Sequence, residues 1–89
     1  MKANDQFILR TIAGERLLIP VGEAALSVKG MIALSESGVL IYEKLKGGCT
    51  KDELIAALTS EYEVSEEEAA RDTDAFLDQM RQLNMLVED

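Results

Sequence analysis

The chain has 89 residues, of which 47% are hydrophobic and 29% are charged, and its net charge is −8 at pH 7. This composition is too apolar for a disordered tail, and the length predicts a single domain over residues 1–89. A lone cysteine, Cys49, and the lack of histidine exclude an internal disulfide, the usual zinc sites and a thiol activated by an imidazole, so we expect no metal, no cofactor and no enzyme.

Three short apolar runs in the first part of the chain have the composition of β-strands. Phe7–Ile12 and residues 16–19 flank a short turn that contains glycine and predict a β-hairpin, which Pro20 ends. Residues 21–29 are expected to form a loop, and residues 31–34 a third strand. Three strands without a fourth leave an edge whose backbone groups are free to pair.

From residue 35 onward the apolar period changes from two to about 3.6, which predicts three helices. Ser35, Thr50 and Ser65 stand where each helix begins, and the last two precede a glutamate by three residues, which is the capping-box pattern. Gly47 and Gly48 are expected to end the first helix with a left-handed residue. The predicted buried face of the third helix consists of Phe76, Leu77, Met80 and Leu83.

Three strands followed by three helices predict an α+β fold of the winged helix-turn-helix class, in which a three-stranded antiparallel sheet precedes a three-helix bundle. Many domains of this class bind DNA through basic residues of a recognition helix. Here the last helix offers only Arg71 and Arg81 among several acids, and the net charge of −8 would repel a duplex. We therefore expect no nucleic-acid partner, and DNA binding is the less favoured alternative.

The order and spacing of these segments resemble the PqqD family, small proteins and domains that recognise precursor peptides of ribosomally made, post-translationally modified natural products. The resemblance runs nearly end to end and involves Phe7–Ile12, Pro20, residues 30–35, Gly38, Thr50, Glu53, Leu54, Tyr62, Asp72, Phe76, Leu77 and Leu86. Many members have glycine after the last helix, where this chain has Asn84. Asparagine also adopts the left-handed conformation, so the helix end is expected to survive, but a role in making pyrroloquinoline quinone does not follow.

The resemblance implies that a leader peptide is added as a strand along the third strand and against the third helix, and is then delivered to a modifying enzyme, often a radical S-adenosylmethionine protein. Unpaired backbone groups of an edge strand bind an extended peptide, and a neighbouring apolar groove selects its side chains. Within the third strand, Ile32 and Leu34 are expected to face the core. The candidate peptide-binding residues are Lys29, Met31, Ile32, Ala33, Leu34, Arg71, Asp74, Ala75, Leu77, Asp78 and Arg81.

Several interpretations stay open from the residues alone. The chain could be a protein-protein adaptor that uses the winged fold without a leader peptide, and two copies could pair through the exposed sheet edge. The segment Glu88-Asp89 is expected to be a solvated tail. The chain begins without a signal-peptide pattern, and its apolar runs are far shorter than the roughly 20 residues of a membrane-spanning helix, so we expect a cytoplasmic protein with no membrane partner.

Overall fold

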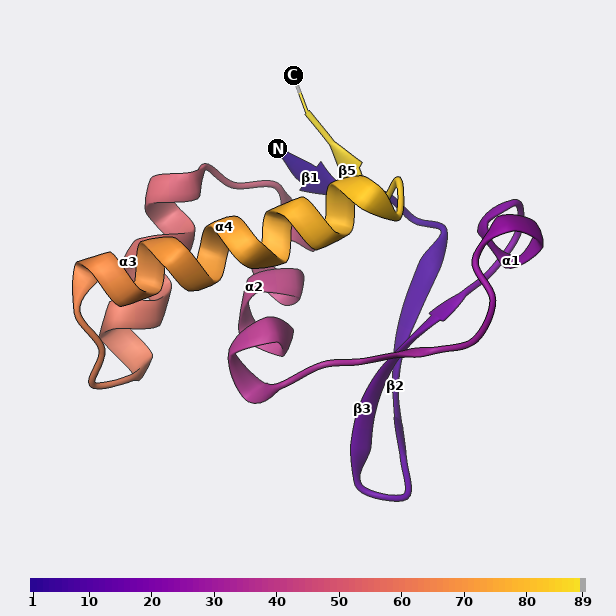
Figure 1. The fold of residues 1–89 in the computed structure, drawn as a ribbon, viewed down its shortest axis with the longest axis horizontal. Coiled ribbons are helices and arrows are strands. Elements are labelled where there is room, and N and C mark those ends of the chain that lie inside the picture. Colours follow the sequence, from indigo (N-terminus) through magenta and orange to yellow (C-terminus); the bar gives the residue numbers. More distant parts are fainter. Residues whose placement is uncertain (89) are drawn as a thin grey trace.

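The computed structural model describes residues 1–88 and contains two small sheets and four helices (Figure 1). Strands β2 (Phe7–Ile12) and β3 (Glu15–Pro20) form an antiparallel hairpin, and β4 (Ile32–Ala33) pairs with the other side of β3. The hairpin turn has positive φ at both Ala13 (52°) and Gly14 (83°), as a two-residue turn that matches the strand twist requires. The predicted three-stranded antiparallel sheet is confirmed, with a third strand shorter than expected.

A second sheet joins the two ends of the chain, which lie side by side in Figure 1. Strand β1 (Lys2–Ala3) pairs antiparallel with β5 (Leu86–Val87), and the sequence analysis predicted neither strand. The Met1 ammonium group donates to the carbonyl oxygen of Cys49 at 3.1 Å, and the Cys49 N–H donates to the carbonyl oxygen of Met1 at 2.9 Å. These bonds attach the N-terminus to residues 48–50, which connect the helices α2 (Glu36–Gly47) and α3 (Lys51–Glu61).

The three predicted helices are confirmed as α2 (Glu36–Gly47), α3 (Lys51–Glu61) and α4 (Glu66–Gln82). The expectation of a plain loop over residues 21–29 is wrong, because this segment contains a one-turn helix, α1 (Ala24–Ser27), which projects away from the helical bundle in Figure 1. Among the described residues, no helix has the length and apolar character needed to cross a bilayer.

The helix starts follow the hydroxyl residues that the sequence places there. The Ser35 hydroxyl accepts a hydrogen bond from the Gly38 N–H at 3.2 Å, and Thr50 forms the complete capping box with Glu53. At Ser65 only half of the predicted box forms, because the hydroxyl accepts from the N–H of Glu68 but the returning bond is not among those of residues 1–88. Gly48 ends α2 with a φ of 85° and an extended ψ of 134°, so its φ is positive as expected but its ψ is not helical.

The core lies between α2, α3 and α4 and extends to Phe7 of β2 and Leu18 of β3. Its largest fully buried side chains are Leu18, Tyr42, Leu45, Leu54, Thr73, Leu77, Met80 and Met85. The Tyr42 hydroxyl donates to the carbonyl oxygen of Phe7 at 3.2 Å, which ties α2 to β2, and burial raises the pKa of this phenol. Beyond α4, Asn84 takes the left-handed conformation expected of it, with a φ of 56°.

Candidate functional site

The outer edge of β4 has no strand beside it among residues 1–88. On its inner side, β4 pairs with β3 so that Ile32 lies opposite Leu18, and the Leu34 N–H donates to the carbonyl oxygen of Arg16 at 2.9 Å. Backbone groups in an antiparallel ladder alternate between the two sides of a strand. The N–H and C=O of Ala33 therefore point to the open side, where an extended peptide can pair with them.

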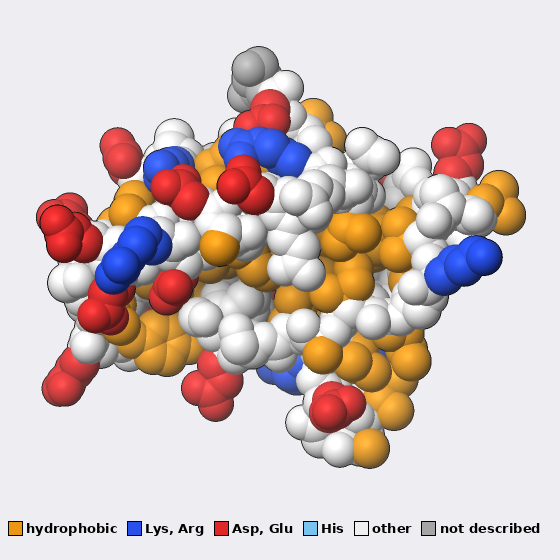
Figure 2. Space-filling model, in the orientation of Figure 1, with side chains coloured by type: hydrophobic (Ala, Val, Ile, Leu, Met, Phe, Trp, Pro, Cys, Tyr) orange, Lys and Arg blue, Asp and Glu red, His pale blue; other side chains and the backbone are white. Residues whose placement is uncertain are grey.

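An apolar groove runs between β4 and α4. It is lined by Leu18, Ile32, Leu34, Phe76, Gln79, Met80, Leu83 and Met85. Figure 2 shows hydrophobic side chains gathered in the hollow between α4 and the segment that leads to α2. Ile32 and Leu34 pack against the core, as predicted, while Met31 is 56% exposed. The groove is shallow, with a volume of about 10 Å³, because side chains nearly fill it.

Most of the helical residues expected to line this groove lie elsewhere. Successive residues of an α-helix are about 100° apart, so Asp74 and Asp78 lie almost opposite Phe76 on α4. The Asp74 carboxylate is 2.6 Å from the Lys51 ammonium group on α3. Leu77 is 1% exposed and belongs to the core, not to the groove wall.

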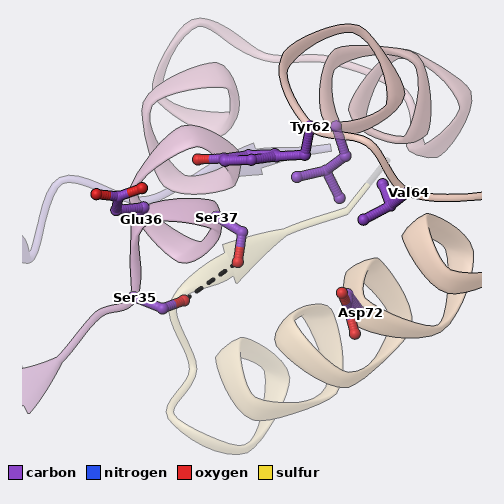
Figure 3. Close-up of a pocket in the computed structure, with 7 residues that line it drawn as sticks. Ser35, Glu36, Ser37, Tyr62, Val64 and Asp72 are labelled. Atoms are coloured by element: carbon purple, nitrogen blue, oxygen red, sulfur yellow. Dashed lines mark hydrogen bonds between the residues drawn. The ribbon is translucent and has the colours of Figure 1, made fainter.

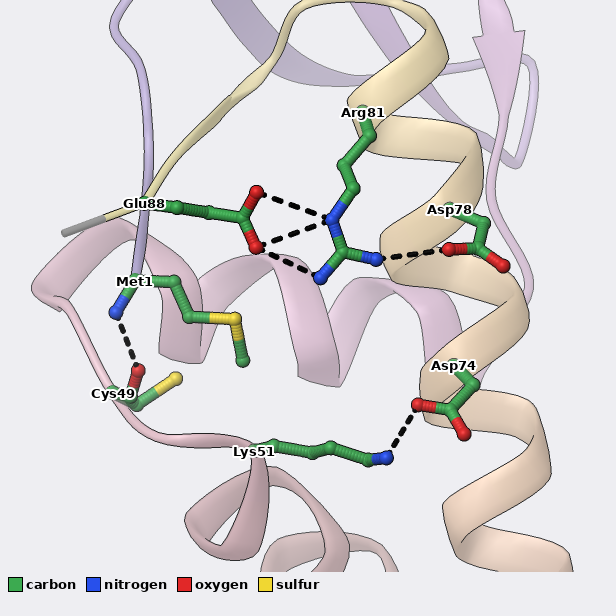
Figure 4. Close-up of polar contacts among 7 residues, drawn as sticks. All are labelled: Met1, Cys49, Lys51, Asp74, Asp78, Arg81 and Glu88. Atoms are coloured by element: carbon green, nitrogen blue, oxygen red, sulfur yellow. Dashed lines mark hydrogen bonds and ion pairs between the residues drawn. The ribbon is translucent and has the colours of Figure 1, made fainter.

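The basic residues predicted to bind the peptide also lie outside the groove. Arg71 is exposed and lies about 140° around α4 from Phe76. Arg81 is held by two carboxylates, with its Nη1 2.8 Å from Asp78 Oδ1 and its Nη2 2.8 Å from Glu88 Oε1 (Figure 4). Neither arginine lines the groove. Lys29 is exposed on the segment before β4.

The helical side of the groove is made instead by Phe76, Gln79 and Leu83, with the buried Met80 beneath them. The helical period predicts that Phe76 and Leu83 belong to the buried face, but both are only partly buried. Gln79 and Leu83 follow Phe76 by three and seven residues, and this spacing identifies a single helical stripe. It does not indicate that the stripe is the margin of the buried face.

The groove continues past β4 toward the start of α2. A second hollow of about 280 Å³ is lined by Ser35, Ser37, Gly38, Ile41, Asp72, Ala75, Phe76 and Gln79, so the predicted Ala75 lies here. A third hollow of about 300 Å³ follows, lined by Ser35, Glu36, Ser37, Leu58, Tyr62, Val64 and Asp72 (Figure 3). Shared lining residues connect these hollows with the β4 groove.

The opposite end of the groove is polar. A hollow of about 290 Å³ beside α1 is lined by Asn4, Gln6, Glu23, Ala24, Ser27, Leu83 and Asn84. Leu83 is common to this hollow and to the apolar groove. A peptide lying along β4 would therefore pass amide and hydroxyl side chains at one end and apolar and acidic side chains at the other.

The exposed or partly buried ionisable groups with shifted pKa values, Cys49, Arg81 and Glu88, do not line the groove or the hollows described above. Burial and the neighbouring Glu53 raise the pKa of the Cys49 thiol, which keeps it protonated. Hydrogen bonds from Arg81 lower the pKa of Glu88, which is exposed to solvent as expected, and Asp89 lies outside the described residues. Among residues 1–88, no three acidic or cysteine side chains are grouped to hold a metal ion.

Comparison with known proteins gives two solved structures of similar fold. TbiB1 in complex with the TbiA(beta) leader peptide is 25% identical, with a TM-score of 0.76 and coverage of 100% of both chains. Lasso peptide synthetase B1 complexed with the leader peptide is 22% identical, with a TM-score of 0.76 and coverage of 98% of this chain and 96% of that chain. No curated protein matches the sequence significantly. The family model described as coenzyme PQQ synthesis protein D (PqqD) matches residues 17–86, and the chain belongs to the PqqD family.

Proposed function

We propose that this protein binds the leader region of a ribosomally made precursor peptide and presents it to a modifying enzyme. The observation that supports this most directly is the unpaired edge of β4 beside the apolar groove of α4. The two structures of similar fold are complexes with leader peptides, which supports the same role here. In this proposal residues 1–89 act as one recognition domain in the cytoplasm and perform no catalytic step.

The open side of β4 supplies affinity and the groove supplies selection. Ala33 and Met31 offer backbone groups to any extended peptide, whereas the groove admits only those apolar side chains that fit beside Phe76 and Leu83. Because side chains nearly fill the groove, a peptide side chain can enter only when one of the side chains that line the groove changes rotamer. The thioether of Met80 is well suited to this, since methionine is unbranched and flexible.

The enzyme that receives the peptide is proposed from the family resemblance. Resemblance to the PqqD family favours a radical S-adenosylmethionine enzyme, which stays a prediction, as does pairing of two copies through the sheet edge. A protein-protein adaptor without a leader peptide would also keep the fold. It would not require an open strand edge and an apolar groove to lie side by side.

The proposal is tested by NMR titration of the labelled protein with the leader region of a short peptide encoded beside its gene. We expect shifts concentrated on residues 31–34, Phe76 and Gln79, with no comparable shifts at Asp74 and Asp78 on the opposite side of α4. A scrambled leader of the same composition is the control for simple charge attraction. Shifts confined to the opposite side, or equal binding of the scrambled peptide, would contradict the proposal.

A further inference from the structure

The hollow at the start of α2 is a second place where the surface can hold a side chain. It has a volume of about 300 Å³, and α2, α3, α4 and the connection between α3 and α4 all contribute to its wall. Leu58, Tyr62 and Val64 form an apolar side, and Asp72 reaches toward the opening from α4 (Figure 3). An apolar wall with a single convergent carboxylate is suited to a side chain that has both an aliphatic stem and a charged head.

This hollow is continuous with the proposed peptide groove. It shares Ser35, Ser37 and Asp72 with the neighbouring hollow, which in turn shares Phe76 and Gln79 with the groove beside β4. Ser35 lies two residues after the end of β4, so a peptide that pairs with β4 and continues past its end toward α2 passes over these residues.

The charges favour a cation at this position. Asp74 is paired with Lys51 and Asp78 with Arg81, but Asp72 forms no ion pair with any side chain of residues 1–88. The helix start does not offer a free anion site, because the Ser35 hydroxyl caps the Gly38 N–H.

Two further features of the rim agree with this. The Ser35 and Ser37 hydroxyls are hydrogen-bonded to each other at 3.2 Å, so they are already engaged (Figure 3). Glu36 stands at the rim with its carboxylate turned outward and adds negative charge, within a chain whose net charge is −8.

We propose that this hollow binds a long basic side chain of the same peptide, arginine in preference to lysine. Its stem would pack on Tyr62 and Val64, and its guanidinium group would meet the Asp72 carboxylate and lie near the Tyr62 ring. The inference rests on the proposed function and adds to it a requirement for a basic residue beyond the strand-paired part of the leader.

The test uses N-acetyl-arginine N-methylamide as the probe, titrated into the labelled protein in the millimolar range. We expect NMR shifts at Ser37, Tyr62, Val64 and Asp72, and roughly five-fold weaker binding of the uncharged citrulline analogue, as the loss of one exposed charge contact implies. Shifts spread over the acidic surface, or equal binding of citrulline, would overturn the inference.

Two matched variants separate the pocket from the overall charge. Asp72→Asn should remove the preference for arginine over citrulline, whereas Glu67→Gln should retain it. Both changes remove one negative charge from α4, but Glu67 is five residues from Asp72 and so about 140° around the helix from it. Equal losses in the two variants would reduce the effect to general attraction and contradict the inference.

The same titrations distinguish this inference from the proposed function. If the arginine probe fails while the leader peptide still shifts residues 31–34, the basic subsite is wrong and leader binding stands. If the probe binds the hollow but the leader peptide leaves residues 31–34 unchanged, the proposed function fails, and the assignment of the hollow to that peptide fails with it.

Discussion

The open side of β4 allows strand addition to be tested with one substitution. Ala33→Pro removes the N–H that faces the open side, whereas the N–H of Leu34, which donates to Arg16 at 2.9 Å, is retained. Proline is tolerated on an edge strand where its missing N–H would face solvent. The variant should therefore keep its helices and its sheet but lose a donor that the peptide needs.

The expected loss follows from a single hydrogen bond. Without the Ala33 N–H, one carbonyl group of the bound peptide is buried against the strand with no donor, which costs about 1 to 3 kcal/mol. A loss of about 2 kcal/mol corresponds to roughly 30-fold weaker binding. The proline ring also occupies space on the open side, so this value is a lower bound for a peptide paired at this residue.

The assay is fluorescence anisotropy of a labelled leader peptide, accompanied by thermal unfolding followed by circular dichroism. Ala33→Thr keeps the N–H and should bind within about two-fold of the parent protein. Leu34→Pro is the contrasting variant, because it removes a bond inside the sheet and should lower the melting temperature. A folded Ala33→Pro variant with unchanged affinity would refute pairing at β4.

Three further predictions concern α4 and the residues that touch it. Thr73→Val should raise the free energy of unfolding in urea by about 1 kcal/mol, since the buried Thr73 hydroxyl has no hydrogen-bond partner among residues 1–88; an unchanged value would indicate that it is satisfied. Gly38→Ala should not gain the roughly 1 kcal/mol that alanine usually gains over glycine in a helix, because its Cβ would lie 3.2 Å from the Phe76 ring, and a full gain in thermal unfolding would show that this ring moves freely. The pKa of Glu88 is lowered in the fold by Arg81, so its contribution to stability is complete above the ordinary value of 4.5 and is lost as the pH falls through the lowered value. The protection of the β5 amides against hydrogen exchange, relative to an unfolded chain at the same pH, should then fall in the parent protein and change less in Glu88→Gln.

The parts of the fold that the sequence predicts are those specified by neighbouring residues. Ser35, Thr50 and Ser65 each mark a helix start because a side-chain oxygen accepts from an N–H only three residues away. The hairpin turn at Ala13 and Gly14 is equally local. The pairing of β1 with β5 joins segments more than 80 residues apart, and strands of two residues have no alternation from which pairing could be predicted.

The strand residues proposed from the sequence lie beside the open edge and the apolar groove, whereas most of the proposed helical residues do not line that groove. The sequence identifies Leu77 and Met80 as buried, but it does not fix the direction from which β4 approaches α4. Phe76 and Leu83 therefore look like core residues, although they lie where the buried face meets the groove. The sequence shows Arg81 as an exposed charge that could bind a peptide. In the fold its guanidinium group is paired with Glu88, which lies beyond the end of the helix.

The shortness of β4 has a consequence for the time that a peptide stays bound. A two-residue edge offers few backbone bonds, and differences in affinity among related complexes arise mainly from the dissociation rate. Dissociation from such an edge is fast unless the groove adds apolar contacts. A carrier with this geometry exchanges its cargo readily, which suits a protein that must release each peptide to an enzyme before collecting the next.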